Sequence, residues 1–166
     1  GPLFLAGLWH VWQACKPGGI RWSVPPFLLL VVSFSAAPFI HGSFFYIAEI
    51  LKTVSQVDEP SQAALLELAM RAGLLLLVAY VVAALSGLIG FVWFTTAIAR
   101  GKTMYPRWVA AANPLTCMFA ALLFIRVLPQ PFAQLLSGAP LSVGLLTFFG
   151  LSTALLWHSP ACAPDQ

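Results

Sequence analysis

The residues of this sequence with the clearest capacity for chemistry are His41 and Glu49, in the stretch "HGSFFYIAE". On a helix they lie two steps of four residues apart, with Phe45 between them, so they share a face that drifts by about 40° per step. An imidazole and a carboxylate on one face can act as acid and base. However, no nucleophile accompanies them, and the sequence contains no HExxH or GxSxG motif and no glycine-rich phosphate loop. An enzyme using this pair is therefore the least favoured function, and we expect a non-enzymatic protein without a bound metal.

Histidines in an apolar chain also suggest a haem or a chlorophyll-type pigment. Either His10 or His41 could ligate such a cofactor alone, whereas two axial ligands of one haem must lie in one layer. Helix rise places His10 near one membrane surface and His41 beyond the centre, more than about 10 Å apart along the normal. They are therefore poorly placed to share a haem. A packing or hydrogen-bonding role is the simpler expectation for each, and no cofactor is predicted.

A polar layer is expected near the same membrane surface as His10. Asn113 lies six residues into its predicted span, a depth of about 9 Å, and Gln13 falls at a similar depth. Pro114 removes an amide donor within that span and would free the carbonyl of Ala110 for another partner. The layer has two interpretations. Its side chains could form hydrogen bonds between helices, or they could form a site that binds a ligand or a proton.

A second polar position is expected towards the other surface. Glu49 and Arg126 each lie near the end of a predicted span there, so the two could form an interhelical ion pair. The alternative is a Glu49 carboxylate that simply reaches the interfacial water. His41 lies closer to the membrane centre, and Gly42 beside it permits close approach. The residues predicted for ligand binding are therefore Asn113, His41, Glu49 and Gln13.

The elements that must position these residues lie in lipid. The chain is 60% hydrophobic and only 8% charged, whereas soluble domains carry about 25% charged residues. Its apolar runs have membrane-spanning length and do not alternate as barrel strands do. The expected fold class is all-α, a polytopic transmembrane helical bundle that forms one membrane domain over residues 1–166. We predict five segments and one amphipathic extension, over residues 2–15, 25–51, 72–99, 107–127 and 141–158, with the extension at 60–71.

Basic residues predict the orientation of these segments, because cytoplasmic loops are enriched in Lys and Arg. The loops after the first and third segments hold most of them, namely Lys16, Arg21, Arg100, Lys102 and Arg107. The opposite side holds three basic residues, Lys52, Arg71 and Arg126. Acidic residues on that side partly offset their charge. We therefore expect a bacterial inner-membrane protein with its N-terminus outside and its C-terminus in the cytoplasm. Tyr105 and Trp108 would be interfacial anchors.

Charge and cysteine usage disfavour two further classes of partner. The net charge of +3 is divided among several loops, and without a basic run no nucleic acid is expected. Cys15, Cys117 and Cys162 are an odd number without CxxC spacing, so neither a disulfide framework nor a zinc site is expected. Because the chain opens at Gly1 within an apolar run, a further segment is expected upstream, which could be another span or a signal segment.

Three short motifs carry a resemblance. The motifs are "GLWH" at residues 7–10, "HGSFF" at 41–45, and "YPRW" at 105–108 followed by "NP" at 113–114. With them the chain resembles a poorly characterised group of bacterial multi-span membrane proteins. The resemblance implies a helical bundle and supplies no activity, so it assigns no functional residue.

Two functions fit these expectations. The first is an accessory or scaffolding subunit that packs against other membrane proteins, lipids or pigments, since Ala83/Gly87 and Ser86/Gly90 are small-residue pairs that permit close helix packing. The partner helix could belong to this chain or to another. The alternative is a small carrier or receptor for a lipophilic ligand, lined by helices interrupted at Pro38 and at Asn113–Pro114, as interrupted helices line many transporter sites.

Overall fold

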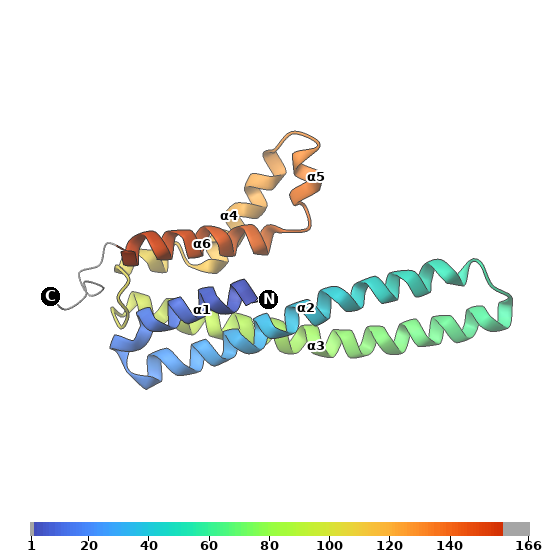
Figure 1. Ribbon diagram of the computed structural model, residues 1–166, viewed down its shortest axis with the longest axis horizontal. Helices are drawn as coiled ribbons and strands as arrows, with labels where there is room; N and C mark the ends of the chain where they lie inside the picture. Colours follow the sequence, from blue (N-terminus) through green and yellow to red (C-terminus); the bar gives the residue numbers. More distant parts are fainter. Residues whose placement is uncertain (1, 158–166) are drawn as a thin grey trace.

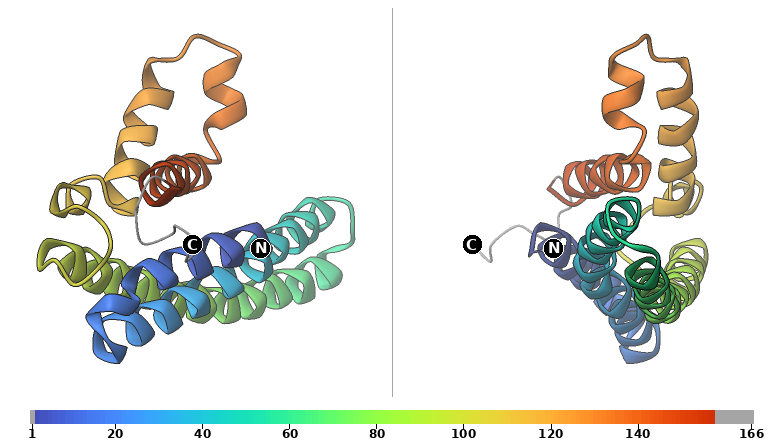
Figure 2. Two further views of the ribbon diagram at one scale, coloured as in Figure 1. Left: turned by 60° about the vertical axis from the view of Figure 1, so that its left-hand side comes forward. Right: turned by 90° about the vertical axis from the view of Figure 1, so that its right-hand side faces the viewer.

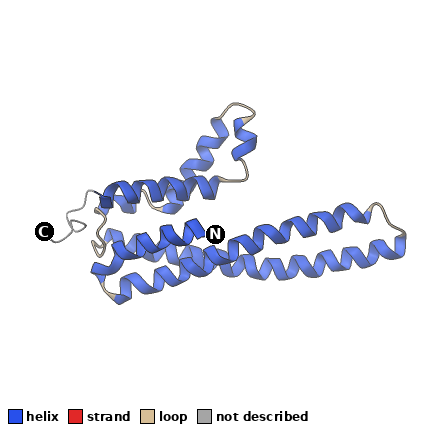
Figure 3. Cartoon of the chain, viewed as in Figure 1, coloured by secondary structure: helices blue, strands red, loops and turns tan. Residues whose placement is uncertain are grey.

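The computed structural model describes residues 2–157, and every regular element in that range is a helix (Figure 3). In chain order the elements are α1 (Pro2–Cys15), the 3-10 turn η1 (Lys16–Gly18), α2 (Ile20–Val54), α3 (Glu59–Ala99), the 3-10 turn η2 (Arg107–Ala110), α4 (Pro114–Val127), α5 (Phe132–Leu136) and α6 (Pro140–Trp157). The predicted all-α fold is confirmed for this part of the chain.

The first predicted segment has the bounds of α1, the predicted segment 107–127 is divided between η2 and α4, and the other three correspond to helices with shifted bounds. α2 begins before Pro25, because Gly19 adopts a φ of 80° and its carbonyl accepts from both the amide and the hydroxyl of Ser23. The predicted extension and the third span form one continuous helix, α3, in which Glu67 and Arg71 form an ion pair. Residue 158, the predicted end of the last segment, and Cys162 lie outside the described residues.

Three of these helices, α2, α3 and α6, are long and apolar enough to cross a membrane. The 41 residues of α3 measure roughly 60 Å at about 1.5 Å per residue, twice the ~30 Å of a hydrocarbon core. α1 and α4 have 14 residues each, which is roughly 21 Å and shorter than that core.

The core lies where α1, α3 and α6 end and α2 begins (Figures 1 and 2). One cluster of buried side chains joins Val11 of α1 to Phe94 of α3 and Phe148 of α6. A neighbouring cluster brings in α2, with Leu8, Leu30, Phe34, Phe91 and Leu145. We call this end of the molecule the basic end, because its turns hold Lys16, Arg21, Arg100, Lys102 and Arg107.

The α2–α3 hairpin continues well beyond this core and past the start of α1 (Figure 1). There the only buried cluster consists, within the described residues, of α2 and α3 side chains, centred on Ile40, Leu76 and Ala83. We call residues 40–54 and 59–83 the outer hairpin. Its two helices pack against each other, and no other described element covers their remaining faces.

Small residues of α3 let it pack closely on α2, outside the outer hairpin. A Cβ added at Gly87 would lie 2.7 Å from Ser33 Oγ, and one at Gly90 would lie 2.9 Å from Leu30 Cγ. Both glycines are buried against α2. The partner of the small-residue pairs Ala83/Gly87 and Ser86/Gly90 is therefore a helix of this same chain.

A second arm, formed by α4 and α5, turns away from the hairpin (Figures 1 and 2). α4 packs mainly on α6, and α5 packs on α4. The α4–α6 contact requires Gly144, because a Cβ there would lie 2.5 Å from the backbone nitrogen of Met118. The molecule thus has two apolar arms joined at the basic end.

Candidate functional site

The basic end gathers cationic side chains from two turns of the chain. Lys16 is the first residue of η1 and Arg21 lies in the first turn of α2, whereas Arg100, Lys102 and Arg107 follow α3. The two turns touch, since a Cβ added at Gly18 would meet the backbone oxygen of Lys102. The carboxylates that the structure describes all lie on the α2–α3 hairpin near its far turn: Glu49, Asp58, Glu59 and Glu67. Within residues 2–157, the basic end is therefore a positive surface without a carboxylate beside it.

Trp22 is the aromatic centre of that surface. The guanidinium carbon of Arg100 lies 5.3 Å from the centroid of its ring, and that of Arg21 lies 5.9 Å from it. On the neighbouring turn, Lys16 Nζ lies 4.5 Å from the ring of Trp12. Cations over aromatic faces at these distances are attracted by the ring quadrupole. Both arginines are thus held at one ring without a described carboxylate beside them.

An apolar groove of about 480 Å³ begins beside Trp22 and follows one face of α3. Apart from Trp22, its lining residues are Leu88, Ile89, Val92, Trp93 and Thr96. The Thr96 hydroxyl donates to the Val92 carbonyl at 2.7 Å, so the polar group in the lining is internally satisfied. Arg100 follows Thr96 by one helical turn, and its guanidinium lies beside Trp22, which also lines the groove.

Tyr105 is a core residue and not the interfacial anchor that the sequence suggested. It is only 3% exposed, and its hydroxyl lies 2.7 Å from Ser152 Oγ on α6, which is fully buried. The rings of Phe94 and Phe148 pack around it at centroid distances of 6.0 and 6.4 Å. Burial raises the pKa of the Tyr105 phenol far above its ordinary value, which the Ser152 hydrogen bond offsets in part. Trp108, by contrast, is exposed.

Asn113 is the N-cap of α4, which corrects the prediction of an unbroken span over 107–127. Its side-chain oxygen accepts from the amides of Leu115 and Thr116 at 2.9 and 3.2 Å. Its side-chain nitrogen donates to the Ala110 carbonyl at 2.9 Å. Pro114 is the first residue of the helix, a position where no amide hydrogen is needed. All these groups are satisfied by the chain itself.

His10 and Gln13 lie half-buried on α1. His10 lines a pocket of about 450 Å³ together with Thr153, Leu156 and Trp157 of α6. Its Nε2 is shielded from solvent and has no hydrogen-bond partner among residues 2–157. The hydrogen bonds of Asn113 remain within its own turn, so no described bond joins the polar layer that the sequence suggested.

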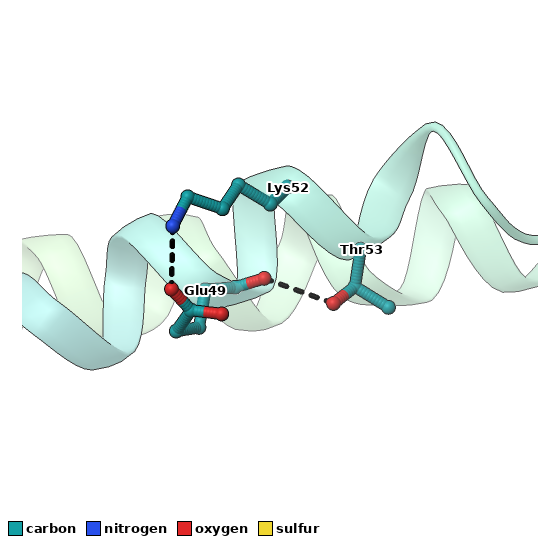
Figure 4. A network of polar contacts seen from close by, with 3 residues as sticks. All are labelled: Glu49, Lys52 and Thr53. Carbon is teal, nitrogen blue, oxygen red and sulfur yellow. Dashed lines mark hydrogen bonds and ion pairs between the residues drawn. The ribbon is translucent and has the colours of Figure 1, made fainter.

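The second polar position is also local (Figure 4). Glu49 pairs with Lys52 at 2.7 Å, and its backbone carbonyl accepts from the Thr53 hydroxyl at 2.9 Å. The predicted Glu49–Arg126 pair is therefore wrong, because Lys52 lies one turn away on the same helix whereas Arg126 belongs to the separate α4 arm. His41 is exposed on α2. His41 and Glu49 thus lie on the open surface of the hairpin, where nothing excludes water or lipid.

Sequence reasoning missed the groove and the Tyr105–Ser152 contact. The spacing of Ile89, Val92, Thr96 and Arg100 along one helix face did carry a signal for the groove. The position of Trp22 beside it depends on how α2 crosses α3, which no local pattern encodes. Ser152 gave no signal, because a serine in an apolar helix ordinarily bonds its own backbone.

Comparison of the sequence with family descriptions finds a match over most of the chain. The sequence profile of a family described as "Family of unknown function (DUF6796)" matches residues 2–159. The chain belongs to this DUF6796 family. The prediction of a poorly characterised family is thereby confirmed. No curated protein and no solved structure matches this DUF6796 member, so its site is interpreted from its own geometry.

Proposed function

We propose that this protein is a non-enzymatic subunit of a membrane assembly, and that the outer hairpin is the surface on which another membrane protein packs. The observation that carries the proposal is the uncovered apolar surface of that hairpin. Large side chains point outward from both helices, among them Tyr46 at 69% exposure, Leu75 at 72% and Val78 at 63%. No other element of the described chain packs on them.

The length of the hairpin supports a protein partner in addition to lipid. The apolar stretch 72–99 of α3 measures roughly 42 Å, whereas a hydrocarbon core is about 30 Å thick. The surplus lies in the outer hairpin, where the exposed side chains are still apolar. A bilayer can absorb such an excess by tilt or local thickening at a modest free-energy cost. Packing against a partner helix covers the same surface without deforming the bilayer.

We place the protein in a bacterial inner membrane with the basic end at the cytoplasmic surface. The support for this orientation is that all five basic residues of two separate turns lie at one end of the molecule. α6 also ends there, so the last described helix runs towards the cytoplasm.

The test is site-specific photocrosslinking in the native membrane. A photoreactive amino acid at Tyr46 or Leu75 should give one product of defined higher mass, whose second component is identified by mass spectrometry. The same probe at Leu146, which is 67% exposed on α6, serves as the control and should give lipid adducts alone. Lipid adducts from all three positions, with a protein that stays monomeric in mild detergent, would contradict the proposal.

A second candidate is a carrier or receptor for a lipophilic ligand such as a pigment. It is favoured by the shielded Nε2 of His10 and by the pocket of about 450 Å³ that His10 lines. Titration with haem and with a chlorophyll-type pigment should then shift an absorption band of the pigment. His10→Ala should abolish that shift, and His41→Ala should retain it. An equal response of the two variants, or none from the unmodified protein, would eliminate this candidate.

A further inference from the structure

We propose that the basic end holds an anionic phospholipid, with one acyl chain in the groove beside Trp22 and the phosphate between Arg21 and Arg100. This inference rests on the membrane placement of the proposed function but not on the partner at the outer hairpin. It assigns a class of ligand to the basic end, which lies outside the outer hairpin where the partner would dock.

The acyl-chain part of the site is a continuous apolar strip. Leu88, Ile89 and Val92 are each about half exposed, at 51%, 50% and 54%, and they line a groove of about 480 Å³. The strip runs along the axis of α3, which is also the direction that a lipid tail takes when helices cross the bilayer. Trp22 lines the groove from α2. An extended hydrocarbon chain matches this shape and its nearly uniform apolarity.

The headgroup part of the site is positive and lies at the correct end. Residues Val92, Thr96 and Arg100 follow one another at four-residue spacing, so the guanidinium of Arg100 continues the strip that the groove occupies. Arg100 and Arg21 both lie within 6 Å of the Trp22 ring centroid. A guanidinium binds a phosphate through two parallel hydrogen bonds. Both guanidinium groups lie at one ring, and an oxyanion that contacts both would lower their mutual repulsion.

Charge complementarity selects a lipid with a net negative headgroup. Five cations occupy the two turns of this end, and the described carboxylates lie at the far end of the hairpin. A zwitterionic lipid would bring a phosphate together with an ammonium group, which these residues would repel. Basic pockets beside membrane helices on the cytoplasmic side bind anionic headgroups for this reason.

The experiment uses the full chain in mild detergent with defined lipids, measured by native mass spectrometry. Phosphatidylglycerol should remain bound more than phosphatidylethanolamine of the same acyl chains. Removing one charge, as in Arg21→Gln or Arg100→Gln, should weaken retention roughly fivefold, and the double variant roughly 25-fold. The matched control is Lys52→Gln with Arg126→Gln, which removes two charges away from the groove and should retain phosphatidylglycerol normally.

Two further measurements distinguish a lipid site from a site that binds the anionic headgroup alone. Ile89→Trp fills the groove at an exposed position, so it should reduce binding of phosphatidylglycerol without changing the melting temperature. The water-soluble headgroup glycerophosphoglycerol should bind much more weakly than the intact lipid. Equal binding of the two, or of Ile89→Trp and unmodified protein, would show an anion site without an acyl-chain groove and would overturn the inference.

The failure of this inference is distinguishable from failure of the proposed function. The double variant Arg21→Gln/Arg100→Gln should still give the crosslinked product from Leu75, because the two sites share no residue. Lost lipid selectivity in the unmodified protein, with that product intact, rejects the lipid site alone. Lost crosslinking with lipid selectivity intact rejects the partner alone.

Discussion

At the scale of single residues, the polar side chains of this protein mostly satisfy one another or the adjacent backbone. Tyr105 and Ser152 form a hydrogen bond between a turn and a helix that are 47 residues apart in the chain. Asn113 satisfies two amides and one carbonyl of its own turn. The Tyr105–Ser152 contact is enclosed by apolar side chains, where an unpaired polar group is costly.

The Tyr105–Ser152 contact predicts unequal effects of its two deletions. Ser152→Ala strands the buried phenol hydroxyl and should destabilise the protein by about 1–3 kcal/mol. Tyr105→Phe should destabilise it less, because the Ser152 hydroxyl can turn to a carbonyl of the preceding helical turn. The double variant should resemble Tyr105→Phe alone. Thermal melting in detergent measures all three, and additive losses would contradict the buried contact.

The N-cap role of Asn113 predicts that its substitution destabilises the protein, whereas a ligand-binding role does not. Asn113→Ala removes the cap of α4 and should lower stability by about 1–2 kcal/mol. Asn113→Asp keeps the acceptor for Leu115 and Thr116 but loses the donor to Ala110, so its melting temperature should be intermediate. An unchanged melting temperature in Asn113→Ala would show that the cap contributes nothing and would return Asn113 to the list of candidate ligand-binding residues.

At the scale of elements, glycines decide how closely the helices approach. Gly144 brings the backbone of α6 against Met118 of α4, and Gly87 and Gly90 bring α3 against α2. Prolines define the start of α4 and α6, at Pro114 and Pro140. These residues set the two-armed arrangement more directly than the apolar residues do, because apolar side chains occur on every face.

Gly144 therefore predicts a position-specific response to alanine. Gly144→Ala drives a methyl group into backbone atoms of α4 that cannot move independently, so it should separate α4 from α6 and lower the melting temperature. Gly150→Ala is the matched control on the same helix, because a Cβ there meets nothing within 4 Å. It should be neutral or stabilise the protein by up to about 1 kcal/mol, as alanine favours helix. Equal effects of the two substitutions would contradict the close crossing.

At the scale of the whole molecule, the turns of the basic end carry one charge sign and the far turn of the hairpin carries the described carboxylates. This distribution predicts the labelling of single cysteines by a membrane-impermeant maleimide in a background without Cys15, Cys117 and Cys162. Gln56→Cys in the far turn should react in intact cells. Lys102→Cys should react only after permeabilisation. Labelling of Lys102→Cys in intact cells would invert the proposed orientation.

The sequence predicted the helical class and the five apolar segments because long apolar runs have few alternatives in lipid. It placed Asn113 inside a helix because a proline after a polar residue is compatible with either an interrupted helix or a new one. The sequence analysis paired Glu49 with Arg126 because the two residues have similar estimated depths in the membrane. The actual partner of Glu49 is Lys52, which lies beside it on the same helix. Depth along a helix can be counted from residues, but the neighbours around a helix depend on packing between distant segments.

The two arms also imply an order of assembly. α2 and α3 are joined by a short turn and make the largest contact in the molecule, so this hairpin can form as soon as both helices have left the ribosome. The turn that contains Tyr105 must then wait for α6, the last described helix to be synthesised, before its hydroxyl meets Ser152. Until that moment, the nascent protein exposes a tyrosine and the faces of α1 and α3, which makes this interval the point at which quality-control proteases would most readily recognise it.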